Sequence, residues 1–164
     1  MMANNTLAKT GIMSFLVLLL HSATCMAAAD SNHEQLFKQG MEYYADENYP
    51  DASDFFSRAV ALAPYTSTYH HWLGKSYGRQ AEQANIFKAY ELSKKTRAEL
   101  ERAVELDNRN IEALEDLMKF YQQAPGFLGG GQDKADGICR RLQELQEESA
   151  KNHPGSGENP PQKC

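Results

Sequence analysis

A spaced series of small and large residues between positions 36 and 64 constrains the fold of this chain more than any other feature. The series is Leu36, Gly40, Tyr43, Ala52, Phe56, Ala59 and Pro64. In a helix over residues 33–46, its first three members lie at i, i+4 and i+7 and form one stripe. A second helix starting near Pro50 places Phe56 between two alanines, and Gly40 lets the two helices approach closely. The spacing therefore predicts an antiparallel helical hairpin that Pro64 terminates.

The same spacing resembles the tetratricopeptide repeat, a helix-turn-helix unit of about 34 residues in which small and large residues recur in this order. A second copy begins near Ser67, and a third opens at Ile111. The second copy repeats the stripe with His70, Leu73, Gly74 and Tyr77. The resemblance implies an all-α fold, specifically a right-handed α-solenoid of about three antiparallel helix pairs, with repeats at residues 33–66, 67–110 and 111–148.

The second and third copies depart from the repeat pattern. Residues 81–93 form an insertion without proline or glycine, which predicts longer helices rather than an open loop. Residues 124–131 read APGFLGGG and indicate a helix stop followed by a turn. A last helix over residues 132–150 carries an apolar stripe and is suited to cap the array. The stripe consists of Ala135, Ile138, Cys139, Leu142 and Leu145. This combination resembles a group of exported bacterial tetratricopeptide proteins, and that likeness implies no defined activity.

The first 29 residues have the features of a secretory signal peptide. Lys9 supplies the positive end, residues 12–20 form an apolar run, and three alanines at 27–29 precede Asp30. The run is shorter than the roughly 20 apolar residues that cross a membrane. We therefore expect an exported protein, periplasmic in a Gram-negative bacterium and otherwise secreted, with no stable membrane span after cleavage. An uncleaved anchor, or lipid attachment at Cys25, is the less favoured alternative. The helical domain is expected over residues 30–150, and residues 151–164 are expected to form a disordered tail.

The charge balance limits the classes of partner, and the cysteine content raises the question of a disulfide bond. The formal net charge of −5 becomes about −6 without Lys9, because 16 basic residues then face 22 acidic ones. This balance argues against a nucleic-acid partner, which would need clustered lysine and arginine. A local basic cluster at residues 94–97 is flanked by glutamates and is interpreted as a solvated helix face. Export permits a disulfide between Cys139 and Cys164, but Cys139 lies on the apolar stripe, where core packing is the favoured interpretation.

Several fragments imitate catalytic motifs without their essential residues. The glycines at 126–131 lack the Lys and Ser or Thr of a phosphate-binding loop, and Phe37 stands where the zinc-protease motif that begins at His33 requires a second histidine. His70 and His71 are adjacent, so on a helix they point about 100° apart and do not readily share a metal ion. We expect no enzyme activity, no cofactor and no metal site.

The functional expectation comes from the family resemblance. In tetratricopeptide arrays the first helix of each pair lines a concave groove that binds peptides or proteins. The corresponding positions here are Phe37, Met41, Tyr44, His71, Lys75, Arg79, Glu115, Lys119 and Gln122, with Gln123 beside the last. These residues predict a groove that is apolar at one end and basic in the middle, and a ligand segment with an apolar anchor followed by carboxylates. Packing of Phe37, Met41 and Tyr44 against the array itself is an equally weighted alternative.

Self-association is the alternative function. The insertion at 81–93 places Ile86, Phe87, Tyr90 and Leu92 on a segment that has no partner in a standard repeat. Exposed apolar residues of this kind often mark an interface between proteins. The chain is then either a scaffold that binds an unidentified protein or peptide, or a structural protein that assembles with its own copies.

Overall fold

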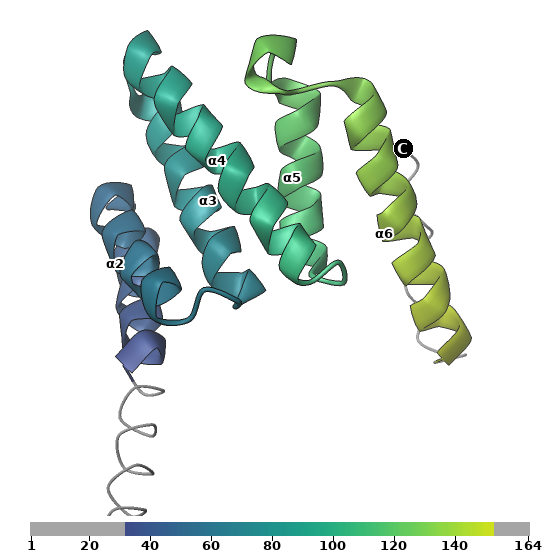
Figure 1. Cartoon of the computed structure of the whole chain (residues 1–164), viewed down its shortest axis with the longest axis horizontal. Coiled ribbons are helices and arrows are strands. Elements are labelled where there is room, and N and C mark those ends of the chain that lie inside the picture. The colour runs from purple at the N-terminus through teal and green to yellow at the C-terminus, as the bar shows by residue number, and fades with distance from the viewer. Residues whose placement is uncertain (1–31, 153–164) are drawn as a thin grey trace, which may run out of the picture.

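The computed structural model describes residues 32–152, and this part of the chain is built from helices without strands, which confirms the all-α prediction (Figure 1). The described chain is helical over residues 32–45. There follow α2 (Tyr49–Leu62), α3 (Ser67–Gln83), α4 (Ile86–Leu106), α5 (Ile111–Gln123), a short 3-10 helix η1 (Gly126–Leu128) and α6 (Gln132–Asn152). The expected signal peptide and the part of the expected tail after Asn152 lie outside the described residues. Lys151 and Asn152, which we assigned to that tail, belong to α6.

Helices that follow one another in the sequence pack side by side. The main contacts join α2 to α3, α3 to α4, α4 to α5 and α5 to α6, whereas α3 and α5 touch only slightly. Figure 1 shows the same progression from one end of the molecule to the other. This neighbour-to-neighbour order is compatible with an α-solenoid. It also leaves α3 and α5, which both pack on α4, with little contact between them.

The first helix pair interlocks through a glycine and a phenylalanine. Phe56 on α2 is fully buried at 0% exposure, and so are its neighbours Ala52 and Ala59. A Cβ atom added to Gly40 would lie 2.6 Å from Cε1 of the Phe56 ring, so only glycine leaves space for the ring in this position. The predicted interlocking of a small and a large residue is therefore seen directly.

Asparagine side chains fix the starts of three helices. Asn48, Asn85 and Asn110 precede α2, α4 and α5, and each accepts a hydrogen bond from the backbone N–H three residues later. Such caps satisfy donors that have no partner within the helix. Because the cap at Asn85 starts α4 directly after α3, the insertion at 81–93 is helical except for Ala84 and Asn85. The predicted lengthening of the helices is confirmed.

The long α4 changes the shape of one end of the molecule. It has 21 residues whereas α5 has 13, so at 1.5 Å per residue α4 is longer by about 12 Å. The chain returns from α5 through residues 124–131, and η1 within this turn contacts α4. In Figure 1 the tip of the α3–α4 pair and η1 lie at the same end. The two departures from the repeat pattern therefore meet in space.

The triglycine turn depends on backbone packing at one of its glycines. A Cβ atom on Gly130 would lie 1.8 Å from the carbonyl oxygen of Ala124, whereas one on Gly131 meets nothing within 4 Å. We expect Gly130→Ala to lower the free energy of unfolding by about 1–3 kcal/mol, as overpacking does in tight interiors. The matched control Gly131→Ala should stay within about 0.5 kcal/mol of the unmodified chain. Urea unfolding followed by circular dichroism checks both, and equal stabilities for the two variants would contradict the packing.

Cys139 is both buried in the core and disulfide-bonded, two states that the sequence analysis treated as alternatives. Its side chain is buried on the inner face of α6 with Ala135, Leu142 and Leu145, as the stripe predicted. The structure also records it in a disulfide bond, so the preference for core packing without a bond was wrong. The partner cysteine lies outside the described residues. The predicted pairing with Cys164 stays a prediction.

A buried histidine links the α2–α3 turn to α4. Nδ1 of His70 lies 2.7 Å from a carboxylate oxygen of Glu99, and Nε2 lies 3.0 Å from the carbonyl oxygen of Pro64. Both acceptors favour the doubly protonated ring, which donates from each nitrogen. The hydrogen bond with Glu99 raises the pKa of His70; burial opposes this shift, and the Pro64 carbonyl adds to it.

This geometry predicts a pH-dependent stability. A raised folded-state pKa means that the stabilisation by His70 is complete below the unfolded-state pKa of about 6.5 and is lost as pH rises through the folded value. We expect the free energy of unfolding, measured in urea from pH 5.5 to pH 8.5, to decline with rising pH. His70→Gln should flatten that decline, and an unchanged slope in this variant would assign the pH dependence to other groups.

Candidate binding groove

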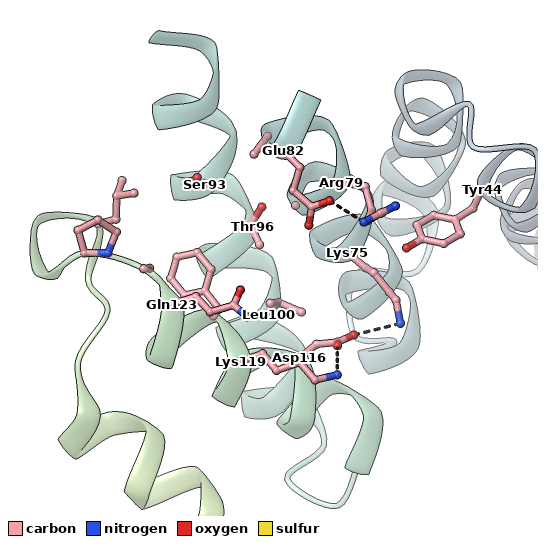
Figure 2. Close-up of a pocket in the computed structure, with 16 residues that line it drawn as sticks. Tyr44, Lys75, Arg79, Glu82, Ser93, Thr96, Leu100, Asp116, Lys119 and Gln123 are labelled. Atoms are coloured by element: carbon pink, nitrogen blue, oxygen red, sulfur yellow. Dashed lines mark hydrogen bonds and ion pairs between the residues drawn. The ribbon is translucent and has the colours of Figure 1, made fainter. Parts of the chain in front are cut away.

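A groove of about 580 Å³ opens between α3 and α5. Lys75 and Arg79 of α3 line one wall, and α5 with the turn that follows it lines the other. Ser93, Thr96 and Leu100 of α4 also line it, and Figure 2 shows them on one helix at the back of the opening. The groove occupies the space that the weak contact between α3 and α5 leaves open. Its lining includes both charged side chains and apolar ones.

The charged region is organised around a single carboxylate. Asp116 of α5 accepts a hydrogen bond from Nε2 of His71 at 2.8 Å, because a carboxylate can only accept. Nζ of Lys75 lies 3.2 Å from the same oxygen, and Nζ of Lys119 lies 3.5 Å from the other one. Figure 2 shows the two ion pairs with the lysines on either side of Asp116. The carboxylate therefore ties α3 to α5 across the groove.

These contacts keep Asp116 ionised. Burial by itself would raise its pKa, but the hydrogen bond from His71 and the charge of Lys75 outweigh burial and lower the pKa from 3.8 to about 2. His71 is only 1% exposed, so its ring supports Asp116 from within the core. The Lys119 side chain is 60% exposed and reaches solvent on the other side. Lys119 is thus the cation of this cluster that a ligand meets first.

A second polar cluster lies farther along α3. Nη1 of Arg79 is 2.5 Å from a carboxylate oxygen of Glu82, and its Nε and Nη2 each lie 3.3 Å from the Tyr49 hydroxyl. Tyr44 also lines the groove. Burial, with the neighbouring Tyr49, raises the pKa of Tyr44 to about 12, so its hydroxyl stays protonated at neutral pH. This end of the groove thus presents a positioned guanidinium and a phenol.

The apolar region lies toward the triglycine turn. It is lined by Leu100 of α4, Phe120 of α5 and three residues of the turn, namely Ala124, Pro125 and Leu128. A backbone hydrogen bond from Gly130 to Pro125 closes the turn, and one from Gly131 to Tyr121 holds it against α5. The groove is therefore apolar at the α5–η1 end and polar at the α3 end.

The structure brings together four of the nine predicted contact residues. Tyr44, Lys75, Arg79 and Lys119 line the groove, as does Gln123. The other five lie elsewhere, and two of them, Glu115 and Gln122, are on α5 but are not among the groove-lining residues. His71 is buried behind Asp116. The groove is thus assembled from only part of the predicted set.

Phe37 and Met41 pack into the first helix pair. The Phe37 ring stacks on Tyr69 at 4.8 Å between centroids and also contacts Phe56 at 5.4 Å. Met41 packs against the cluster that contains Phe56 and Leu73. This matches the alternative in which these side chains cover the array, and the apolar end of the groove lies instead beside η1.

Sequence reasoning missed the carboxylates of the groove. Asp116 and Glu82 pair with the predicted cations, so three cations, Lys75, Arg79 and Lys119, share the groove with two acidic side chains. The predicted basic middle is therefore only slightly positive, because the two carboxylates offset two of the three cations. A signal was present in the i, i+3 spacing of Asp116 and Lys119 and of Arg79 and Glu82, which places such pairs on one helix face.

The described residues contain no group of three or more histidine, cysteine or acidic side chains placed to hold a metal ion. Between residues 32 and 152, no helix is both long enough and apolar enough to cross a membrane. The two adjacent histidines bind different carboxylates, Glu99 and Asp116. What the groove offers is a set of positioned charges beside an apolar surface.

Comparisons with known proteins add no assignment to this picture. No protein-family model matches the chain, and no curated protein matches it.

Proposed function

We propose that this chain is a non-catalytic scaffold of an exported compartment that binds an extended segment of another protein in the groove between α3, α4 and α5. In this proposal the helix pairs form a right-handed tetratricopeptide-like solenoid, and the groove is part of its concave face. The observation that supports it best is the groove itself, in which four predicted ligand-contacting residues line one opening. No cofactor and no metal belong to the proposal.

The chemistry of the groove specifies the ligand. Phe120, Pro125 and Leu128 supply an apolar surface at one end, which suits an aliphatic or aromatic anchor. Lys119 and Lys75 flank Asp116 at the other end. A ligand carboxylate that approaches the exposed Lys119 meets a cation whose existing ion pair is largely solvated and therefore weak. The ligand is thus a segment with an apolar anchor followed by carboxylates, in the direction from η1 toward α3.

The length of the groove sets the length of the segment. Ser93 and Leu100 are seven residues apart on α4, about 10 Å along the helix axis, and an extended chain covers that distance with about three residues at 3.3 Å each. A segment that also reaches the charged cluster needs a few residues more. A displayed library of random 12-residue peptides is therefore long enough to fill the groove.

Selection from this library tests the proposal. We expect the enriched peptides to combine aromatic or aliphatic residues with Asp or Glu. Lys119→Glu should weaken their binding at least tenfold, which corresponds to about 1.4 kcal/mol, as measured by fluorescence anisotropy. Lys95→Glu is the matched control, because Lys95 is an exposed lysine of α4 whose ammonium lies over Tyr77 and which does not line the groove. Equal losses for the two variants, or no enrichment at all, would contradict the proposed function.

A further inference from the structure

Four large apolar side chains are exposed at the end of the molecule where the insertion and the triglycine turn meet. Ile86, Phe87 and Phe127 are 78%, 84% and 77% exposed, and Tyr90 is 40% exposed. The Tyr90 and Phe127 rings stack with centroids 6.4 Å apart, which joins α4 to η1. We call these four residues the tip patch. Side chains this apolar are rarely exposed together on a protein that binds nothing through them.

The tip patch continues the groove. Phe127 lies between Pro125, two residues before it, and Leu128, both of which line the apolar end of the groove. Tyr90 lies about one helical turn before Ser93, which lines the groove from α4. An apolar surface therefore runs from Phe120 and Leu128 to the stacked rings.

The charges around the patch differ from those of the whole chain. Residues 86–94, which include three of the four patch residues, contain two cations, Lys88 and Lys94, and a single carboxylate, Glu91, whereas the chain carries a net charge of −5. The ammonium group of Lys94 lies 5.4 Å from the centroid of the Tyr90 ring. A partner at this surface is therefore favoured if it is apolar and flanked by acidic residues.

The size of the patch argues against a second copy of the chain as its occupant. Aromatic side chains bury on the order of 150–250 Å² each, so the exposed parts of the four side chains offer roughly 500 Å². A standard protein interface buries about 800 Å² on each partner. The patch by itself is too small for a stable dimer, but it is sufficient as one anchor of a peptide that also fills the groove.

We infer that the tip patch is the second anchor of the groove, and that it binds an apolar, acid-flanked stretch of the same partner segment. This inference rests on the proposed function and adds to it the place where the ligand extends beyond the groove. Phe87 and Leu100 are about 20 Å apart along α4, so some six extended residues join the two ends. The apolar stretch of the ligand at Leu128 then continues directly into the stretch at Phe87, because Leu128 follows Phe127 of the patch in the sequence.

The test uses a peptide selected from the random 12-residue library, and the variant Phe87→Ser/Phe127→Ser. We expect this double variant to keep its melting temperature and to bind the peptide at least tenfold more weakly. In a second peptide, the stretch assigned to the tip patch is changed to serine. This peptide should bind the unmodified chain and the double variant with equal affinity. That result would close a double-mutant cycle between the patch and the ligand. Tyr65→Ser is the control, because Tyr65 is 80% exposed in the α2–α3 turn.

The other outcomes overturn the inference without removing the groove. Unchanged peptide affinity in the double variant, with the loss in Lys119→Glu retained, leaves groove binding intact and rejects the second anchor. If that affinity is unchanged while the double variant loses binding to phosphatidylglycerol vesicles, the patch faces a membrane surface. If it is unchanged while sedimentation shows a dimer becoming a monomer, the patch joins two copies of the chain. If neither the double variant nor Lys119→Glu changes the peptide affinity, the proposed function is rejected as well.

Discussion

Replacing Phe56 with alanine is expected to lower the free energy of unfolding by about 3–5 kcal/mol, the range for truncation of a buried phenylalanine. The ring is fully buried between the first two helices and contacts Phe37 and Trp72. Its removal leaves a cavity that the surrounding helices fill only in part. Because a domain of this size is stable by only about 5–15 kcal/mol, the loss is a large share of the total. Urea unfolding followed by circular dichroism measures it.

The matched control is Phe87→Ala, which removes the same atoms from an exposed position. Phe87 is 84% exposed in the first turn of α4, so its removal should change the stability by no more than about 0.5 kcal/mol. Comparable losses in the two variants would show that burial at Phe56 is not what holds the first helix pair together.

A second substitution turns this prediction into a test of the predicted glycine–phenylalanine contact. Gly40→Ala alone should destabilise the chain, because its Cβ atom would lie 2.6 Å from the Phe56 ring. In the Phe56→Ala background the same change meets no ring, and alanine is favoured over glycine in a helix by about 1 kcal/mol. The effect of Gly40→Ala should therefore change sign between the two backgrounds. Identical effects would contradict the contact.

Replacing Asp116 with alanine should cost about 1–3 kcal/mol of stability, because it leaves the buried His71 donor without its acceptor. In the unmodified chain Lys75 and Lys119 both pair with this carboxylate, and the substitution releases them. Asp116→Asn is the discriminating variant, since its amide oxygen still accepts from His71 while the negative charge is gone. Asp116→Asn should lose less stability than Asp116→Ala and bind acidic peptides more tightly. Thermal unfolding and fluorescence anisotropy measure the two effects separately.

The pH dependence of this site has a defined sign. The folded-state pKa of Asp116, about 2, lies below its ordinary value of 3.8. Its contribution to stability is therefore complete above the ordinary value and is lost as pH falls toward 2, and a tenfold difference between the two acid dissociation constants corresponds to about 1.4 kcal/mol. The unmodified chain should lose more stability than Asp116→Asn between pH 5 and pH 2. Parallel curves for the two proteins would place the acid sensitivity elsewhere.

Much of the fold was predictable because it depends on local spacing. The stripe of Leu36 and Gly40 and the alanines around Phe56 follow from positions three to seven residues apart, and these residues are buried in the structure. The helical character of the insertion followed from the absence of proline and glycine. Such features need no knowledge of distant contacts, which is why the all-α prediction was confirmed.

The groove was predictable only in part because it depends on contacts between distant residues. Asp116 and His71 are 45 positions apart in the sequence, and no local sequence pattern predicts their hydrogen bond. The spacing correctly predicts that Phe37 and Met41 lie on the first helix, over residues 32–45. It does not show that Tyr69 packs on Phe37, or that the cluster around Phe56 packs on Met41. In the same way, the stripe on α6 predicted that Cys139 is buried without revealing its disulfide bond.

Amide chemical shifts of the ¹⁵N-labelled chain show where the partner segment binds. On titration with a peptide selected from the 12-residue library, we expect the largest chemical-shift changes on residues that line the groove between α3, α4 and α5, namely Lys75, Arg79, Thr96, Lys119 and Gln123. Residues on the outer faces of α2 and α6 should change little. Changes confined to those outer faces, with the groove residues unaffected, would show that the partner segment does not bind in the groove.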